Sequence, residues 1–380
     1  MGWTGGQYSL YRAALAIAGA AAVVGAFDPA RGGRSSLGAL AVEAVAVAAA
    51  LALVAGFRDR IAAGLLLAGI AAAELFAAGV VAIPSLASLA NERGGPLLGV
   101  LLLLHLAVPR APFGAFDARE RVDPRGGWQR PGWMGGVAWV LLLFVAGVSL
   151  LPAGGPDGAH IRLFRFLPEA AAAAIAIAYR SLRPAVWAAL LLWHLACVFA
   201  FGGASGEAGR LLLLLFAAEP GAWRGRSLAS AGTADRAATA RPARLFYDGD
   251  CGFCHRSVRF ILAEELATPE SLRLRFAALG GEAFHDCLDR HPELEPASLP
   301  DSIVLELEDG TIRTRSAAAL EIASRLGGFW RLLALVLARL PGALLDAAYD
   351  AIARVRKRLF ASPKDVCPIL PPELRARFDA

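Results

Sequence analysis

Hydrophobic residues form long unbroken runs over the first 223 residues, whereas short alternating or helical patterns follow residue 243. Five runs approach the ~20 residues that a helix needs to cross the hydrocarbon core of a bilayer. They are 8–27, 37–55, 61–83, 134–153 and 184–201. Three shorter runs, 96–109, 166–179 and 209–223, each suit a short span, a re-entrant segment or an interfacial helix. The pattern predicts an α-helical polytopic membrane bundle of about eight spans over residues 1–223.

Residues 224–242 have no hydrophobic periodicity and consist of small, polar and Arg residues. This composition is typical of a flexible linker. The pattern changes again at residue 243, where a second domain is expected to begin and to extend to residue 380.

This second domain combines strand and helix patterns. The apolar run 243–248 and the alternating run 272–279 predict strands, and 303–307 with 311–314 predict a hairpin around Asp309 and Gly310. Helical spacing follows residue 251 and recurs over 316–326, ending at Gly327. Two further helical patterns are separated by Pro341. The order strand, helix, strand, helix, hairpin, helix predicts a small α/β domain with helices covering a sheet.

The composition supports a membrane protein. Hydrophobic residues make up 57% of the 380 residues and charged residues 19%, against about 45–50% and about 25% in soluble domains. This excludes intrinsic disorder and disfavours an ordinary cytosolic enzyme. The net charge of +5 comes with Arg clusters between apolar runs, which membrane topology explains. We expect the lipid bilayer as a partner and no nucleic acid, because zinc-finger spacings and aromatic-interleaved basic stretches are missing from the sequence.

Arginine placement predicts the orientation of an eight-span bundle, since the loops richer in Lys and Arg stay in the cytoplasm. One side would carry Arg58, Arg60, Arg110, Arg119, Arg121, Arg125, Arg130, Arg180, Arg183, Arg224 and Arg226. The other would carry Arg31, Arg34, Arg93, Arg162, Arg165 and Arg210. The sequence therefore predicts an integral protein of the bacterial inner-membrane type whose C-terminal domain is cytoplasmic.

Six ionisable residues fall within the predicted spans: Arg12, Glu43, Glu74, His105, Glu169 and His194. A charge at membrane depth costs at least ~2.5–3.5 kcal/mol and usually faces a partner or a water-filled cavity. Structural contacts or snorkelling are expected for Arg12, Glu43 and Glu169. For Glu74 and His194, near the middle of their runs, a proton, ion or small-molecule site and a structural contact both remain open.

Cys251 and Cys254 form a C-x-x-C pair at the junction of a predicted strand and helix. The positive end of a helix stabilises a thiolate, so Cys251, at the helix start, is expected to be the nucleophile. Cys254 is then placed to resolve a mixed disulfide. His255 would add positive charge when protonated, whereas Asp248 and Asp250 would act in the opposite sense or accept a thiol proton.

The segment YDGDCGFC (Tyr247–Cys254) resembles the signature of the DCC family, also called DUF393, of thiol-disulfide oxidoreductases. The resemblance continues through SVRFIL, LRFAAL, DSIVLE, TRSAAALEIASRLGG and YDAIARVRKRLF to DVCPILPPELRARF, and covers about residues 243–378. It implies a thioredoxin-like domain that exchanges disulfides with protein or small-molecule thiols and needs no cofactor. It also implies that Cys367 matches a cysteine found near the end of such domains. The membrane half is faintly similar to HTTM bundles through YSLYRAALA.

Other interpretations of these residues remain open. Cys251 to His255 also fits the C-x-x-C-H pattern of haem attachment, and Cys251, Cys254, Cys367 and a histidine could bind zinc, although we expect no metal. The bundle could instead be a transporter or a lipid-substrate module with a redox-sensing tail.

Cys367 is either a third redox thiol or a packing residue, and Cys197 and Cys287 are expected to be structural. Residues 349–360 form a basic amphipathic pattern, suited to anionic headgroups or to a solvated face.

Overall fold

The computed structural model describes residues 3–28, 36–78, 95–119, 121, 123–124, 126, 128–151, 159–201, 204–220, 241–265, 268, 272–292, 294, 302–359 and 370–379. These residues fall into two compact units. The helical unit contains Tyr8–Arg119 and Trp128–Glu219, and the C-terminal unit contains Met1–Gln7, Glu120–Gly127 and Pro220–Ala380. The predicted linker lies almost wholly outside the described residues, so the expected domain boundaries stay a prediction.

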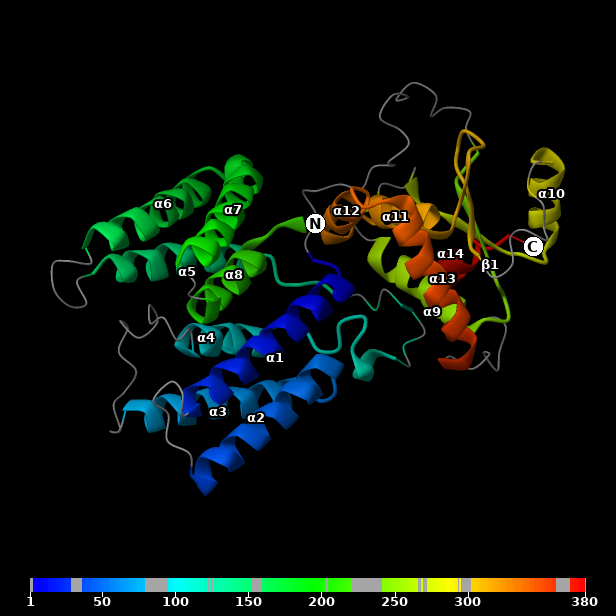
Figure 1. Cartoon of the computed structure of the whole chain (residues 1–380). Coiled ribbons are helices and arrows are strands. Elements are labelled where there is room, and N and C mark those ends of the chain that lie inside the picture. The colour runs from blue at the N-terminus through cyan, green and yellow to red at the C-terminus, as the bar shows by residue number, and fades with distance from the viewer. Residues whose placement is uncertain are drawn as a thin grey trace. The chain divides into compact units, whose positions relative to one another are not determined.

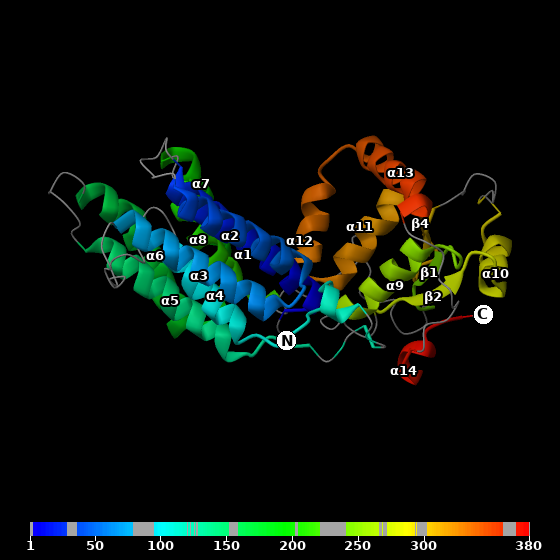
Figure 2. The same ribbon diagram turned by 90° about the horizontal axis from the view of Figure 1, so that it is seen from below.

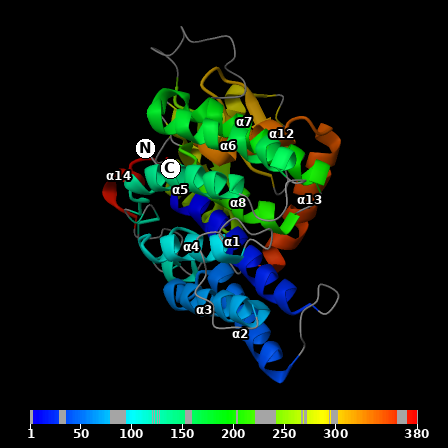
Figure 3. The ribbon, with the colours of Figure 1, turned by 90° about the vertical axis from the view of Figure 1, so that its left-hand side faces the viewer.

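The described residues of the helical unit form eight α-helices, one for each predicted apolar run. They are α1 Gly5–Phe27, α2 Leu37–Ala55, α3 Asp59–Ala78, α4 Gly95–Leu106, α5 Trp133–Leu150, α6 Ala159–Ala178, α7 Arg183–Phe201 and α8 Ala204–Ala217. Figure 3 shows α1–α4, in blue and cyan, on one side of this unit and α5–α8, in green, on the other. Within these groups α2 packs on α3, α3 on α4, α5 on α6 and α7 on α8.

The expected count of about eight spans is not supported. Among the described residues, four helical segments are long and apolar enough to cross a membrane: Gly5–Phe27, Leu37–Ala55, Trp133–Leu150 and Arg180–Ala200. With 12 and 14 residues, α4 and α8 extend about 18–21 Å at 1.5 Å per residue, less than the ~30 Å hydrocarbon core. α6 begins seven residues before the predicted run and so gains Arg162 and Arg165.

The C-terminal unit is a small mixed α/β domain, and the predicted element order is confirmed. Its elements are β1 Arg244–Tyr247, α9 Gly252–Glu264, β2 Arg275–Ala278, α10 Glu282–Arg290, β3 Val304–Glu306, β4 Ile312–Thr314, α11 Arg315–Leu326, α12 Gly328–Leu337, α13 Gly342–Leu359 and α14 Pro372–Arg375. Gly310 (φ 82°) and Gly327 (φ 75°) end the hairpin turn and α11 in conformations that suit glycine.

The four strands form one sheet in the order β2-β1-β3-β4. β1 pairs in parallel with β2 and antiparallel with β3, so the strand that leads to Cys251 is central. Alternate residues of β1 face opposite sides: Leu245 and Tyr247 pack with α9, α11 and α14, whereas Phe246 packs with α10. Figures 1 and 2 show α10 on the far side of the strands from α9 and α11. The helices on the two faces of the sheet hold β1 in place, and the candidate site lies at its carboxyl end.

Candidate functional site

The candidate site begins where β1 ends. The Asp248 carboxylate accepts the N–H of Asp250 at 3.0 Å, and the Asp248 carbonyl accepts the N–H of Cys251 at 3.3 Å. This tight turn delivers Cys251 to the N-cap position of α9, with extended backbone angles (φ −93°, ψ 112°). The strand-to-helix junction predicted for the C-x-x-C pair is therefore present.

The Cys251 side chain caps α9. Its Sγ accepts the backbone N–H of Cys254 at 3.4 Å, which satisfies one of the N–H groups that a helix start leaves unpaired. The N-cap position also places the Cys251 sulfur at the positive end of α9. Both cysteines are largely buried, with exposures of 4% for Cys251 and 3% for Cys254.

The Cys254 thiol is held in its protonated form. Burial and the hydrogen bond with Cys251 raise the pKa of Cys254 to about 12, and the positive charge of Arg356 opposes this shift. A thiol must lose its proton to act as a nucleophile. In disulfide exchange, Cys254 therefore suits the second step, in which it reacts with a neighbouring sulfur, better than the first attack on a substrate disulfide.

This difference predicts a distinctive alkylation profile for the reduced protein. Iodoacetamide is expected to modify Cys254 more slowly than an ordinary thiol of pKa about 8.5, with a rate that rises about tenfold per pH unit between about pH 8 and 10. The reason is that only the thiolate reacts and its population grows steadily below a pKa of about 12. Mass spectrometry of the Cys254 peptide measures the rate. A Cys254 rate that levels off below about pH 9 would contradict the prediction.

The three polar residues predicted to support the cysteines have different surroundings. The His255 ring Nε2 hydrogen-bonds the Gly249 carbonyl at 2.7 Å, and the ring meets Tyr247 edge-on at 5.7 Å. His255 therefore holds the turn before Cys251. Asp248 is half-buried and near enough to oppose ionisation of Cys254, whereas Asp250 is exposed.

Arg356 belongs to this site and was missed by sequence reasoning. Residues 349–360 were expected to form a headgroup-binding or solvated face, yet Arg356 of α13 is only 3% exposed. Its Nη2 lies 3.9 Å from the Asp248 carboxylate. The helical spacing of Tyr349, Ile352, Ala353 and Arg356 places them on one face, a signal that could have separated Arg356 from exposed Arg354.

The region that contains the cysteine pair is similar to known proteins. Residues 245–362 match the family described as DCC1-like thiol-disulfide oxidoreductase. The chain is also 33% identical over 134 residues to "Uncharacterized protein YuxK" of Bacillus subtilis (strain 168). The alignment covers 91% of YuxK and 35% of this chain. The chain belongs to the DCC1-like family. No solved structure matches it, and similarity of the N-terminal region to HTTM bundles is not shown.

Two of the remaining cysteines bear on the DCC1-like domain. Cys367 lies outside the described residues. Cys287 is fully buried on α10, where it packs with Phe246 and Phe284, consistent with a structural role.

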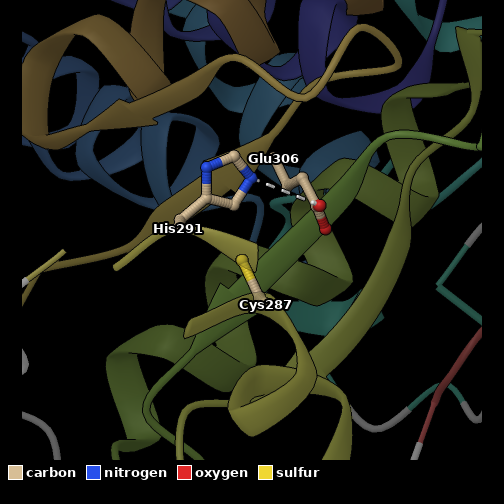
Figure 4. Close-up of side chains that lie close together, drawn as sticks. All are labelled: Cys287, His291 and Glu306. Atoms are coloured by element: carbon tan, nitrogen blue, oxygen red, sulfur yellow. Dashed lines mark ion pairs between the residues drawn. The ribbon is translucent and has the colours of Figure 1, made fainter. Parts of the chain in front are cut away.

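Cys287 also belongs to a group whose chemistry could suit a metal ion, with His291 and Glu306 (Figure 4). One potential ligand atom from each lies within 4.8 Å of the others. However, the Glu306 carboxylate accepts a hydrogen bond from Arg290 at 2.7 Å and lies 4.0 Å from Arg244. A cation would have to compete with these two guanidinium groups, so we assign Glu306 to the ion pairs with Arg290 and Arg244, where β3 ends beside the start of β1.

The structure brings His194, an intramembrane candidate, into a buried polar network between helices α5–α8. His194 Nδ1 lies 2.8 Å from the Glu207 carboxylate, and its Nε2 lies 3.8 Å from Glu169. Arg210 donates to Glu169 at 2.6 Å and to Ser149 at 2.5 Å, and Arg165 pairs with Glu207. Opposite charges therefore compensate one another across these helices.

Glu74, the second intramembrane candidate, does not join this network in the described residues. It is half-buried on α3 and lies against Gly95, the first residue of α4. A Cβ at Gly95 would clash with the Glu74 carboxylate. A carboxylate at a helix start is favoured by the helix dipole, so this placement suits a helix-to-helix contact.

Proposed function

We propose that the protein is a membrane-anchored thiol-disulfide oxidoreductase, with Cys251 as the nucleophile and Cys254 as the resolving thiol. The observation that carries this proposal is the N-cap position of Cys251, whose Sγ accepts the N–H of Cys254. The match of residues 245–362 to DCC1-like thiol-disulfide oxidoreductases supports it. One parallel and two antiparallel strand pairs, with Cys251 after the central strand, support a thioredoxin-like domain.

The exchange follows from the two thiol environments. The Cys251 thiolate attacks one sulfur of a substrate disulfide, forming a mixed disulfide and releasing the other sulfur as a thiolate. Cys254 then loses its proton and attacks the Cys251 sulfur, which forms the Cys251–Cys254 disulfide and releases the second substrate thiolate. Asp248 is the proposed acceptor of the Cys254 proton, because its carboxylate lies close to both Cys254 and Arg356. The reverse sequence oxidises a substrate dithiol.

The proposed membrane anchor is the set of four apolar helical segments, and the proposed side of the C-terminal domain is the cytoplasm. If only these four segments span, the arginines on the same side as the C-terminus are Arg58, Arg60, Arg93, Arg110, Arg119, Arg121, Arg125, Arg130, Arg210, Arg224 and Arg226. Those on the other side, including two at the start of the fourth segment, would be Arg31, Arg34, Arg162, Arg165, Arg180 and Arg183. With four spans, as with eight, the side that carries more arginine is the side of the C-terminal domain.

Thiol trapping in intact cells tests the proposed activity. Cells are quenched with acid, and free thiols are labelled with a mass-tagging maleimide in wild type, Cys251→Ser and Cys254→Ser. We expect a wild-type disulfide that responds to oxidant and reductant, mixed disulfides that accumulate in Cys254→Ser, and neither in Cys251→Ser. If both thiols stay reduced under oxidant, or react only after metal is stripped, the oxidoreductase proposal fails.

A further inference from the structure

A cavity of about 290 Å³ adjoins Cys254 inside the C-terminal unit. Its walls come from β1 and from four helices, α9, α11, α12 and α13. Figure 1 shows these helices on one side of the sheet. The lining is almost entirely apolar and includes Leu245, Phe253, Val258, Ile322, Trp330 and Ile352. Sites for small organic molecules are concave, mostly apolar and about 300–1,000 Å³ in size, so this cavity suits one ring system.

Most polar groups in the wall bond to the protein itself. The Tyr349 hydroxyl accepts the Ile303 N–H at 3.1 Å, Ser257 donates to the Phe253 carbonyl at 3.0 Å, and Trp330 donates to Glu264 at 2.6 Å. Cys254 and the buried Arg356 also line the cavity. A ligand would therefore meet an apolar surface, a thiol and a cation with several N–H donors.

The helices around the cavity also carry apolar residues on their outer surface. The exposed side chains include Leu332, Leu333, Leu335 and Val336 of α12, Leu340 of the connection, and Leu344 and Val355 of α13. Together α12 and α13 are apolar enough to be a broken span, with a bend of 119° between them. An exposed apolar patch of this kind is typical of a membrane-contacting or ligand-binding surface, and it would give lipid-soluble compounds a path to the cavity.

We propose that the cavity binds a lipid-soluble quinone that oxidises the Cys251–Cys254 dithiol. An apolar ring fits the lining, a quinone carbonyl oxygen can accept from Arg356, and the ring would lie beside the Cys254 sulfur. A polypeptide would need more hydrogen-bonding groups along the wall, and a plain acyl chain would use neither Cys254 nor Arg356. This inference rests on the proposed dithiol activity and assigns its direction.

The redox step is balanced. Cys254, the cysteine of the pair that lines the cavity, passes its proton to Asp248, the acceptor proposed for disulfide exchange, and its sulfur adds to the quinone ring. The Cys251 thiolate then attacks the Cys254 sulfur. The S–S bond forms as the Cys254–ring bond breaks, and its electron pair leaves with the ring. The two thiol protons end on the two quinone oxygens. One dithiol is oxidised to a disulfide and one quinone is reduced to a quinol. The disulfide is then available to oxidise substrate thiols.

The test uses the full chain, purified in detergent micelles and reduced. Decylubiquinone, a fully substituted benzoquinone with an alkyl tail, and glutathione disulfide are offered separately as oxidants. Quinol formation is followed by absorbance and thiol loss by maleimide labelling. We expect saturable oxidation by decylubiquinone with one quinol formed per disulfide.

Two pairs of variants locate the site. Ala319 lines the cavity from an exposed position on α11, and exposed Ala317 on the same helix does not line it. Ala319→Trp is expected to lower the ratio of the quinone rate to the glutathione disulfide rate about tenfold, equivalent to about 1.4 kcal/mol, and Ala317→Trp to leave this ratio unchanged. Arg356→Gln is expected to raise the KM for the quinone, whereas Arg354→Gln, at an exposed position, is not.

The outcomes separate this inference from the proposed function. If neither oxidant forms the disulfide, the proposed oxidoreductase activity itself fails. If glutathione disulfide reacts but decylubiquinone does not, or if Ala319→Trp and Ala317→Trp behave alike with the quinone, the quinone site is overturned and the dithiol activity stands. If Ala319→Trp instead slows only a disulfide peptide with apolar residues, the cavity serves a polypeptide and the quinone inference is also overturned.

Discussion

Replacing Arg325 by leucine is expected to destabilise the C-terminal unit by about 3–5 kcal/mol, the usual cost of removing one partner from a buried ion pair. Arg325 is only 1% exposed. It donates to Glu321 at 2.9 Å and, through both terminal nitrogens, to Glu308 at 2.7 and 2.8 Å. Without Arg325, the equally buried Glu321 side chain loses this partner.

Hydrogen–deuterium exchange of the full chain in detergent measures this loss. The most protected amides of β3 and α11 should exchange at least about a hundredfold faster in Arg325→Leu, since 1.4 kcal/mol corresponds to a factor of ten. Arg290→Leu is the control, because its pair with Glu306 is partly exposed and such pairs contribute about 0–1 kcal/mol. Equal exchange in the two variants would show that the Arg325 cluster does not stabilise the unit.

The same variant should change the acid sensitivity of the domain. Burial alone would raise the pKa of Glu308, but the hydrogen bonds from Arg325 outweigh it and hold this pKa below its usual value. A carboxyl whose pKa is lowered by folding stabilises the fold above its unfolded pKa of about 4.3, and this contribution is lost as the pH falls through the folded pKa. Arg325→Leu should therefore lose less stability than wild type below about pH 4.3.

Replacing Glu264 by leucine is expected to release the N-terminal residues Trp3–Gln7 from the C-terminal unit. The fully buried Glu264 carboxylate accepts hydrogen bonds from the Gly6 N–H at 2.8 Å, from Trp330 at 2.6 Å and from the Thr4 hydroxyl. Each buried donor left unsatisfied costs about 1–3 kcal/mol. Glu264→Gln should destabilise the unit less than Glu264→Leu does. The glutamine amide oxygen can still accept a hydrogen bond, although its NH₂ group would face another donor.

Exchange at the Gly6 amide and cleavage by protease near residues 3–7 measure this release. We expect both to increase at least about tenfold in Glu264→Leu, with Glu264→Gln intermediate. Glu282→Leu, at an exposed position of α10, should leave both at the wild-type level. Wild-type protection of Gly6 in Glu264→Leu would contradict the proposed anchoring by this carboxylate.

Glu264 also predicts a pH dependence of opposite sign to that of Glu308. Burial raises the pKa of Glu264, and the hydrogen bonds from Thr4 and Trp330 oppose this only partly. The folded state therefore binds the proton more tightly, so this contribution to stability is complete below about pH 4.3 and is lost as the pH rises through the folded pKa. Because glutamine does not titrate, Glu264→Gln should not show this fall in stability as the pH rises.

Local sequence patterns predicted the C-terminal elements because those signals act over short distances. Alternating apolar residues gave the strands, the Asp309–Gly310 turn gave the hairpin, and the pattern broken at Pro341 gave two helices. The C-x-x-C pair after an apolar strand also predicted a helix start at Cys251. The same reasoning overestimated the number of spans, because apolarity marks a helix whether it crosses a bilayer or only packs within a bundle.

Composition and local patterns were enough to predict the membrane-like N-terminal region, the order of the C-terminal elements and a cysteine pair at a helix start. The residues that meet this pair from far along the chain depend on how the elements pack together. Arg356, about a hundred positions beyond Cys254 in the chain, reaches Asp248 because α13 packs against α9. Similarly, His194 meets Glu169 only because α6 and α7 pack together. Periodicity assigns a residue to a face of its own helix, but the partner of that face depends on packing between elements, which no local pattern contains.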